Sequence, residues 1–228
     1  MTGVVPEQRR PRRNLKDEVA IYIREQIFSG AFKPGQKIDQ DRVAQEFGVS
    51  KLPVREALIA LESEGLVDNL ARRGAFVAQL TPEDVADHYA IFGMLVALAH
   101  ERASERITDA QVSVLEQILE RMEATRDLAE QEALNDDFHR MVNQIGGSRR
   151  LKSVLRVLAQ GIPRGFFEFT PDWSEQAMRD HRSILKALRE HDGEAAARQA
   201  RQHLADGGRA AVAMLRATGF WDGMDSEI

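Results

Sequence analysis

The stretch GVSKLPVREALIALESEGLV, residues 48–67, decides how the first part of this chain folds. Gly48 is expected to end a short helix, because glycine enters a left-handed turn without steric cost. Ser50 is a suitable N-cap for the helix that follows. Apolar residues then recur at helical spacing and form a stripe that can be buried: Val54, Ala57, Leu58 and Leu61. Lys51 and Arg55, four residues apart, share the opposite face, so two cations lie near the start of this helix.

Two further helices are expected upstream of this stretch. Residues 15–29 carry a helical apolar stripe, which consists of Val19, Ile23, Ile27 and Phe28, and Gly30 ends it. A turn at Pro34-Gly35 follows, and Asp39 can cap a short second helix that leads into Gly48.

The segment downstream is expected to form a two-stranded wing. Its turn contains Arg72, Arg73 and Gly74, and residues 75–78 run back as the second strand. Three helices and a wing make residues 15–79 a winged helix-turn-helix. The alternative is a small helical packing module with a solvated basic face.

The run PGQKI…VAQEFGVSKLPVREALIALESEGLV…RRGAFVA closely resembles the DNA-binding domain of GntR-type bacterial transcription regulators. The resemblance implies that this domain binds a double-stranded DNA operator, with the cations of the recognition helix near phosphates and base edges. Lys51 stands where relatives usually carry arginine. The residues expected to contact DNA are Ser50, Lys51, Leu52, Arg55, Arg72, Arg73 and Gly74.

Composition is ordinary for a globular protein with room for two modest domains. The chain has 228 residues, of which 43% are hydrophobic and 29% charged. No apolar run approaches the ~20 residues of a membrane span, and the N-terminus lacks the apolar core of a secretory signal. We therefore expect a cytoplasmic protein without a membrane partner. The absence of cysteine excludes disulfides and thiolate metal sites.

The net charge of −5 is distributed unevenly. Residues 1–80 hold 13 Lys/Arg and 11 Asp/Glu, whereas residues 81–228 hold 18 and 25. A DNA-binding domain needs local cations, because these displace counterions from DNA. The acidic residues of the second domain discourage DNA from binding to that domain. Residues 1–14 form a basic N-terminal arm. Its RRPRR run, residues 9–13, either follows phosphates or a minor groove, or is a solvated tail.

Residues 80–222 are expected to form an all-α antiparallel helical bundle. Thr81 and Pro82 are typical of a helix start, and Thr108 with Gln111 makes a capping box for the next helix. Four more helices are predicted, at about residues 128–144, 149–160, 173–191 and 193–216. No alternating strand pattern follows the wing, so the fold class is mainly α. More weakly, this part resembles the C-terminal domain of the FadR branch of the GntR family, which senses a small ligand and dimerises.

Three histidines on three different predicted helices suggest a metal site. His139, His181 and His203 could converge inside a bundle with Asn135, which is one turn before His139. From spacing alone, surface histidines are the alternative. The resemblance favours the site, because many FadR-branch domains bind a divalent metal through a D/N-x-x-x-H motif and two later histidines. Asn135 stands where aspartate is commoner in relatives, and its uncharged amide oxygen is a weaker metal ligand than a carboxylate. Asp136 could supply the oxygen ligand in its place. Zinc or nickel suits this ligand set.

The effector site is less well marked. Relatives often carry arginine and glutamate on the first helix of this domain, where this chain has Phe92 and Val96. The ligand is therefore more apolar, or another residue such as Arg164 binds a carboxylate. Core packing is the alternative for Phe92 and Val96. Trp173 and Trp221 either line a pocket or cap the bundle. The remaining histidines, expected to be exposed or helix-terminal, are His88, His100 and His191.

These expectations describe a homodimeric, ligand-responsive transcription repressor that binds a pseudo-palindromic operator. It senses a small molecule, and carboxylates are the candidate ligands. The rival interpretation is a metal-dependent enzyme with a DNA-binding appendage. Against the rival, the chain has no H-E-x-x-H motif, no glycine-rich phosphate loop and no nucleophile elbow.

Overall fold

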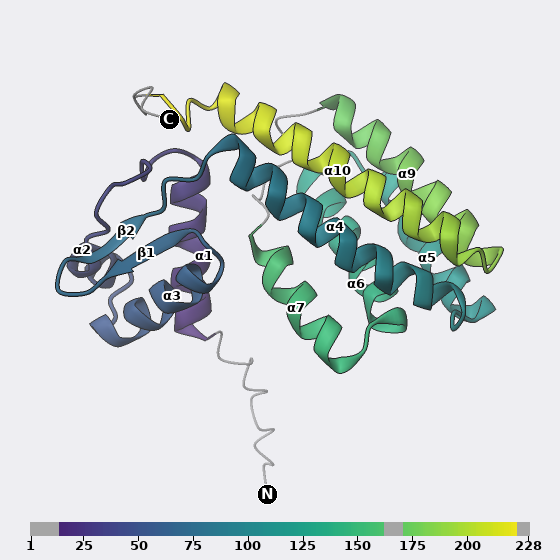
Figure 1. Ribbon diagram of the computed structural model, residues 1–228, viewed down its shortest axis with the longest axis horizontal. Coiled ribbons are helices and arrows are strands. Elements are labelled where there is room, and N and C mark those ends of the chain that lie inside the picture. Colours follow the sequence, from purple (N-terminus) through teal and green to yellow (C-terminus); the bar gives the residue numbers. More distant parts are fainter. Residues whose placement is uncertain (1–13, 162–170, 223–228) are drawn as a thin grey trace, which may run out of the picture. The chain divides into compact units, whose positions relative to one another are not determined.

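The computed structural model describes residues 14–161 and 171–222, without the side chains of residues 171–174. The basic run at residues 9–13 and the effector candidate Arg164 lie outside the described residues. The chain forms two compact units, Met1–Ala78 and Gln79–Ile228 (Figure 1). Within the described part of the chain, no helix is both long and apolar enough to cross a membrane.

The first unit contains three helices followed by a β-ribbon. Its elements are α1 (Leu15–Phe28), α2 (Gln40–Glu46), α3 (Lys51–Ser63), β1 (Val67–Leu70) and β2 (Gly74–Val77). The two strands pair antiparallel from Val67↔Val77 to Leu70↔Gly74. Gly48 has φ +60° between α2 and α3, the left-handed conformation expected of the helix-turn-helix turn. The predicted winged helix-turn-helix is confirmed.

The core of this unit comes from the predicted apolar stripes. Fully buried side chains of α1 and α3 meet across their contact: Val19, Ile23, Ile27, Val54, Leu58 and Leu61. Arg24 of α1 and Glu64, which follows α3, add a buried ion pair with N–O distances of 2.8–3.1 Å. A bidentate pair of this kind fixes α3 relative to α1, since either charge alone would be costly to bury.

Helix caps only partly follow the sequence. The Asp39 side chain accepts hydrogen bonds from the backbone of Asp41 and Arg42, so it caps α2 as predicted. Ser50 is the N-cap residue of α3, but its side chain makes no capping hydrogen bond. The Ser50 hydroxyl is exposed at the start of α3.

The second unit is helical throughout its described residues. Its helices are α4 (Pro82–Ser104), α5 (Asp109–Ala124), α6 (Leu128–Gly146), α7 (Arg149–Gln160), α9 (Pro171–Arg189) and α10 (Gly193–Ala217). Thr81 and Asp84 form a capping box at α4, and the predicted box of Thr108 and Gln111 starts α5. The predicted fold class, mainly α with a helical second part, is confirmed.

Small residues let the central helices of this unit pack closely. α4 and α10 lie side by side along most of their length (Figure 1). A Cβ atom on Gly208 of α10 would come within 2.9 Å of the Tyr89 Cβ on α4. A Cβ atom on Gly146 would come within 1.8 Å of the Ala99 carbonyl oxygen, so the end of α6 packs directly on the α4 backbone. These contacts place the inner faces of α4, α6 and α10 around one interior.

Trp221 closes one end of the bundle. Its indole N–H donates to the carbonyl of Leu80 over 2.7 Å, which links the residue before α4 to the segment after α10. The capping alternative therefore holds for Trp221, whereas the side chain of Trp173 lies outside the described residues.

Candidate nucleic-acid interface and metal centre

The first candidate site is the exposed face at the start of α3. Lys51, Leu52 and Arg55 are exposed there, and Leu52 is 64% exposed although it is apolar. Lys51 forms an ion pair with Asp41 of α2 over 2.6 Å, and both side chains are open to solvent. An exposed pair of this kind is worth little, so Lys51 can exchange Asp41 for another anion.

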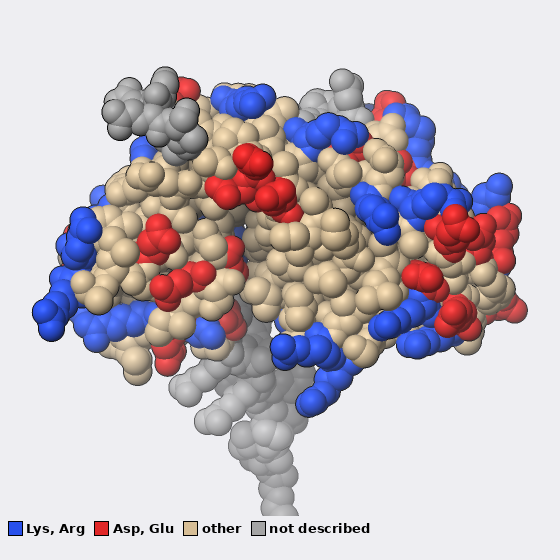
Figure 2. Space-filling view, viewed as in Figure 1, with Lys and Arg blue, Asp and Glu red and all other residues tan. Residues whose placement is uncertain are grey.

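The wing supplies the second group of cations. Arg72 (φ +62°) and Gly74 (φ +103°) form its left-handed turn, and the guanidinium of Arg73 lies 5.6 Å from the Phe76 ring centroid. Figure 2 shows Lys and Arg side chains gathered over this end of the ribbon. Lys37, which was not among the predicted contacts, joins them, with its Nζ 6.0 Å from the Phe76 ring centroid. Lys37 and Arg73 therefore both lie near the Phe76 ring, and Arg72 is exposed in the same turn of the wing.

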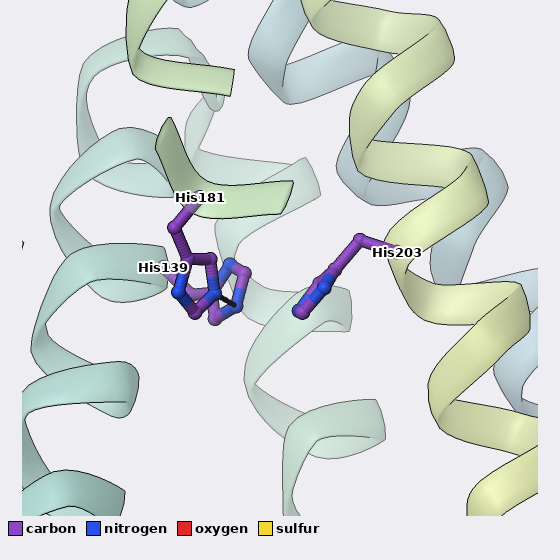
Figure 3. A group of neighbouring side chains, drawn as sticks. All are labelled: His139, His181 and His203. Carbon is purple, nitrogen blue, oxygen red and sulfur yellow. Dashed lines mark hydrogen bonds between the residues drawn. The ribbon is translucent and has the colours of Figure 1, made fainter. Parts of the chain in front are cut away.

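The second candidate site lies inside the helical unit. His139 of α6, His181 of α9 and His203 of α10 each offer a ring nitrogen, and these atoms lie within 4.8 Å of one another (Figure 3). The ring centroids are 4.7–5.1 Å apart. The folded chain therefore brings together three histidines that are spread over 65 residues of sequence.

The chemical state of these imidazoles suits a metal. Burial lowers the pKa of His139 and of His181 well below the usual value, so both rings are neutral at pH 7. Their Nε2 atoms are 3.1 Å apart. Two nitrogens bound to one tetrahedral zinc ion at 2.0–2.1 Å would be roughly 3.3 Å apart. The residues present therefore fit a divalent ion that prefers neutral nitrogen ligands.

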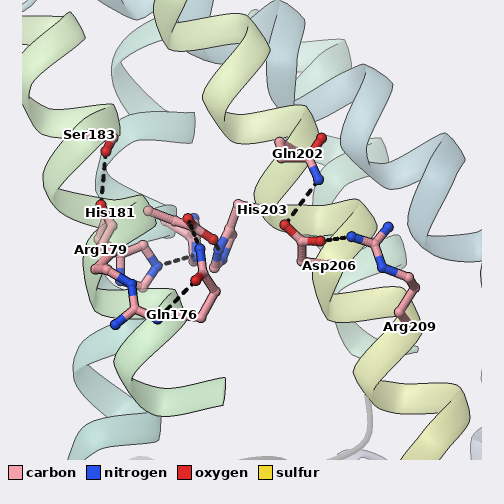
Figure 4. Close-up of polar contacts among 10 residues, drawn as sticks. Gln176, Arg179, His181, Ser183, Gln202, His203, Asp206 and Arg209 are labelled. Atoms are coloured by element: carbon pink, nitrogen blue, oxygen red, sulfur yellow. Dashed lines mark hydrogen bonds and ion pairs between the residues drawn. The ribbon is translucent and has the colours of Figure 1, made fainter. Parts of the chain in front are cut away.

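A carboxylate orients the third histidine. Asp180 Oδ2 lies 3.2 Å from His203 Nδ1, and both side chains are buried. Gln176 donates to Asp180 over 2.7 Å and accepts from Arg179 over 2.9 Å, which continues the chain of polar contacts to the surface (Figure 4). With its Nδ1 proton directed to Asp180, His203 presents the Nε2 lone pair to the centre. Sequence reasoning missed Asp180, although it directly precedes His181.

Replacing Asp180 with asparagine is expected to weaken zinc binding about 10- to 100-fold, because a carboxylate partner holds the ring and raises its basicity. Competition with a zinc chelator measures this affinity. Glu175→Gln changes an exposed acid on the same helix and is the control. Equal zinc affinity in all three proteins would remove Asp180 from the site.

The oxygen ligand is less well placed. Asn135 is half-buried on α6, one turn before His139, and Asp136 is exposed. The structure places the three histidines together, whereas the role of Asn135 stays a prediction.

The expectations for the other histidines need correction. His100 is completely buried in α4, not exposed. His88 is half-buried, with its Nε2 3.0 Å from the Leu158 carbonyl oxygen. His191 is exposed in the turn between α9 and α10, as expected. The periodicity of α4 could not reveal His100, because this helix carries apolar residues on its exposed side as well, namely Ile91, Met94 and Leu98.

Phe92 and Val96 lie in the core of the helical unit. Both side chains are buried on α4, and Val96 is one turn before His100. They lie on the inner side of α4, toward the interior that holds the three histidines. This position is compatible with core packing and with the apolar wall of an effector site.

The buried imidazoles give the metal-free protein a pH-dependent stability. Burial lowers the pKa of His100 to about 4, against 6.5 for an exposed histidine. The unfolded chain therefore binds more protons below pH 6.5, and the free energy of unfolding falls as the pH falls. From pH 7 to pH 5 we expect His100 alone to remove about 2 kcal/mol.

Thermal melting in a chelating buffer between pH 7 and pH 5 measures this effect. His100→Gln should show a weaker dependence than the wild type. Identical pH profiles for the two proteins would show that His100 is not a buried neutral imidazole.

Comparison with known protein families now defines the class. The family of bacterial regulatory proteins named gntR matches residues 15–77, and the FCD domain family matches residues 87–206. The chain belongs to the GntR family and combines its helix-turn-helix domain with an FCD domain, which is consistent with the FadR branch. It is a bacterial transcription regulator that binds DNA.

Individual relatives agree with this class. The chain is 32% identical to the uncharacterized HTH-type transcriptional regulator YdhC of Bacillus subtilis over 188 residues, which cover 79% of this chain and 84% of YdhC. It is 28% identical to the HTH-type transcriptional repressor RspR of Escherichia coli over 207 residues, 88% and 90% of the two chains. The solved structure of E. coli McbR/YncC shares the fold, with a TM-score of 0.65 at 22% identity, and covers 90% of this chain and 98% of that one. YdhC and RspR are named as transcriptional regulators and not as enzymes, so the rival interpretation as an enzyme is set aside.

Proposed function

We propose that this regulator binds a pseudo-palindromic operator as a homodimer and represses transcription until a small molecule binds at the three-histidine centre of its helical unit. The convergence of His139, His181 and His203 inside the FCD domain carries the sensing part of this proposal. The cations at the start of α3 and on the wing carry the DNA-binding part.

Two elements read the DNA. α3 enters the major groove with its first turns, where Ser50 and Lys51 face base edges or phosphates, Leu52 contacts apolar base atoms, and Arg55 binds a phosphate or a guanine. Arg72 and Arg73 bring charge to the phosphates beside that groove, and Gly74 allows the tight approach of the wing backbone. Lys37 extends this cationic group.

The sensing site uses the three histidines to hold one divalent ion, zinc or nickel, with Asn135 as an additional oxygen ligand. The ion would supply an open coordination position for an oxygen of the effector, with a carboxylate as the first candidate. Phe92 and Val96 provide apolar walls beside it, and Arg164 is a candidate partner for the effector's charge.

Homodimerisation is supported by an apolar stripe on α4. Ile91, Met94 and Leu98 recur at helical spacing and remain 53%, 61% and 36% exposed in the single chain. Exposed apolar side chains grouped in this way favour association. A dimer also matches the symmetry of a palindromic operator.

Light scattering of the zinc-loaded protein with an operator duplex, recovered by selection from random sequences, tests the proposal. Two chains per duplex are expected, and one chain per duplex would contradict the dimer.

Acetate, lactate and citrate are then added to the same sample. We expect at least one of them to lower the operator affinity of the zinc-loaded protein at least tenfold, and none to affect zinc-free protein. An operator affinity unchanged by zinc and by all three carboxylates would contradict the sensing role.

A further inference from the structure

The side chain of His100 has a hydrogen-bonding requirement that the described residues do not meet. Its Nδ1 lies 3.0 Å from the backbone carbonyl oxygen of Val96, which fixes the proton on Nδ1 and leaves a lone pair on Nε2. The Nε2 atom is buried and has no hydrogen-bond partner among the described residues. Burial keeps the ring neutral, because it lowers the pKa to about 4. A buried acceptor without a donor destabilises the fold, so a donor from outside the chain is expected.

The three-histidine centre lies next to this acceptor. The ring centroids of His100 and His139 are 6.4 Å apart, whereas no two rings of the triad are more than 5.1 Å apart. The separation of His100 is too long for a ring that shares an ion with the triad. His100 therefore lies beside the triad and not within it.

A second buried acceptor without a partner in the described part of the chain lies on α6, one turn after His139. Asn143 Oδ1 is buried without a hydrogen-bond partner among the described residues. Asn143 is one turn after His139 on α6, and Gly146 brings this end of α6 onto the α4 backbone at Ala99, beside His100. α4 and α6 therefore each carry, near a residue of the triad, a buried acceptor that the described residues leave without a partner.

We propose that His100 and Asn143 form an acceptor subsite for a protonated oxygen at the open coordination position, and that the sensing site therefore selects hydroxycarboxylates over simple carboxylates. The hydroxyl group of the effector has one proton, which it shares between the two acceptors, His100 Nε2 and Asn143 Oδ1. A plain carboxylate oxygen carries no proton and would face those acceptors without a hydrogen bond. Water takes the place of the hydroxyl when no effector is bound. This inference rests on the proposed metal-containing sensing site.

The test compares glycolate with acetate, which differ by one hydroxyl group. Dissociation constants are measured by calorimetry on the full-length zinc-loaded protein and on His100→Phe, which keeps a ring of similar size but removes the acceptor. We expect His100→Phe to retain one zinc per chain, to bind acetate within twofold of the wild type, and to bind glycolate roughly 3- to 10-fold more weakly, the range of one hydrogen bond. His88→Phe, on the same helix, is the control and should leave both constants unchanged.

Asn143→Ala provides an independent variant if His100→Phe does not fold. It should also weaken glycolate more than acetate, with zinc retained. The outcomes separate the two levels of the proposal. A wild-type protein that binds no zinc would overturn the sensing site itself. If both variants, loaded with zinc, bind glycolate with wild-type affinity, the acceptor subsite alone is overturned. The same holds if both variants lose affinity for glycolate and for acetate equally. Loss of zinc in His100→Phe would make His100 a metal ligand and would overturn it as well.

Discussion

Replacing Arg55 and Arg73 with alanine together is expected to weaken operator binding by at least about 100-fold, because each interaction with a phosphate or a base contributes roughly 1–3 kcal/mol. Arg55 is exposed on α3 and Arg73 is exposed on the wing, so neither change opens the core. Fluorescence anisotropy of a labelled operator measures the affinity. A salt series adds a second readout, since the log–log slope should fall by about 0.9 for each phosphate that the variant no longer neutralises.

Each single variant should show part of this effect, and thermal melting should confirm that both proteins are folded. Arg198→Ala, an exposed arginine on α10, is the matched control and should bind the operator as the wild type does. If Arg55→Ala and Arg73→Ala both bind with wild-type affinity, the assignment of this face to DNA is wrong.

Replacing His203 with alanine is expected to remove the bound metal and to lower the melting temperature together. Metal that binds only the folded chain stabilises it by mass action, about 2.7–4.1 kcal/mol when free zinc is 100–1,000 times its dissociation constant. Elemental analysis of protein purified without chelator should give about one divalent ion per wild-type chain and little in the variant. Asn135→Asp should tighten the site, because it adds a negative ligand.

The control for the metal prediction is His191→Ala, which removes an exposed histidine near α10 and should retain the ion. Wild-type protein that remains metal-free after incubation with zinc and with nickel would contradict the site. The assignment of the DNA-binding face would be unaffected, because it depends on residues of the other unit.

The local features of the fold could be predicted because they depend on neighbours in sequence. The buried stripe of α3, the αL turn at Gly48 and the capping boxes at Thr81 and Thr108 all follow from spacings of a few residues. The cap at Ser50 shows the limit, because the residue occupies the N-cap position without making the hydrogen bond.

The sensing site could be predicted only in part. Spacing alone left surface positions open for His139, His181 and His203, and family resemblance was needed to bring them together. Nothing in the sequence indicated that Asp180 contacts His203 across two helices, since that contact depends on how α9 and α10 pack. The burial of His100 was missed because α4 carries apolar residues on both its inner and its exposed side.

The central claim is that α3 and the wing read a specific DNA sequence. Selection of duplexes from a random pool, followed by sequencing, tests it most directly when the wild type and the Arg55→Ala, Arg73→Ala double variant are run in parallel. The wild type is predicted to enrich a two-fold-symmetric consensus at physiological salt, and the double variant to enrich none. A wild-type selection without a consensus, or the same consensus at equal enrichment from the double variant, would contradict the account.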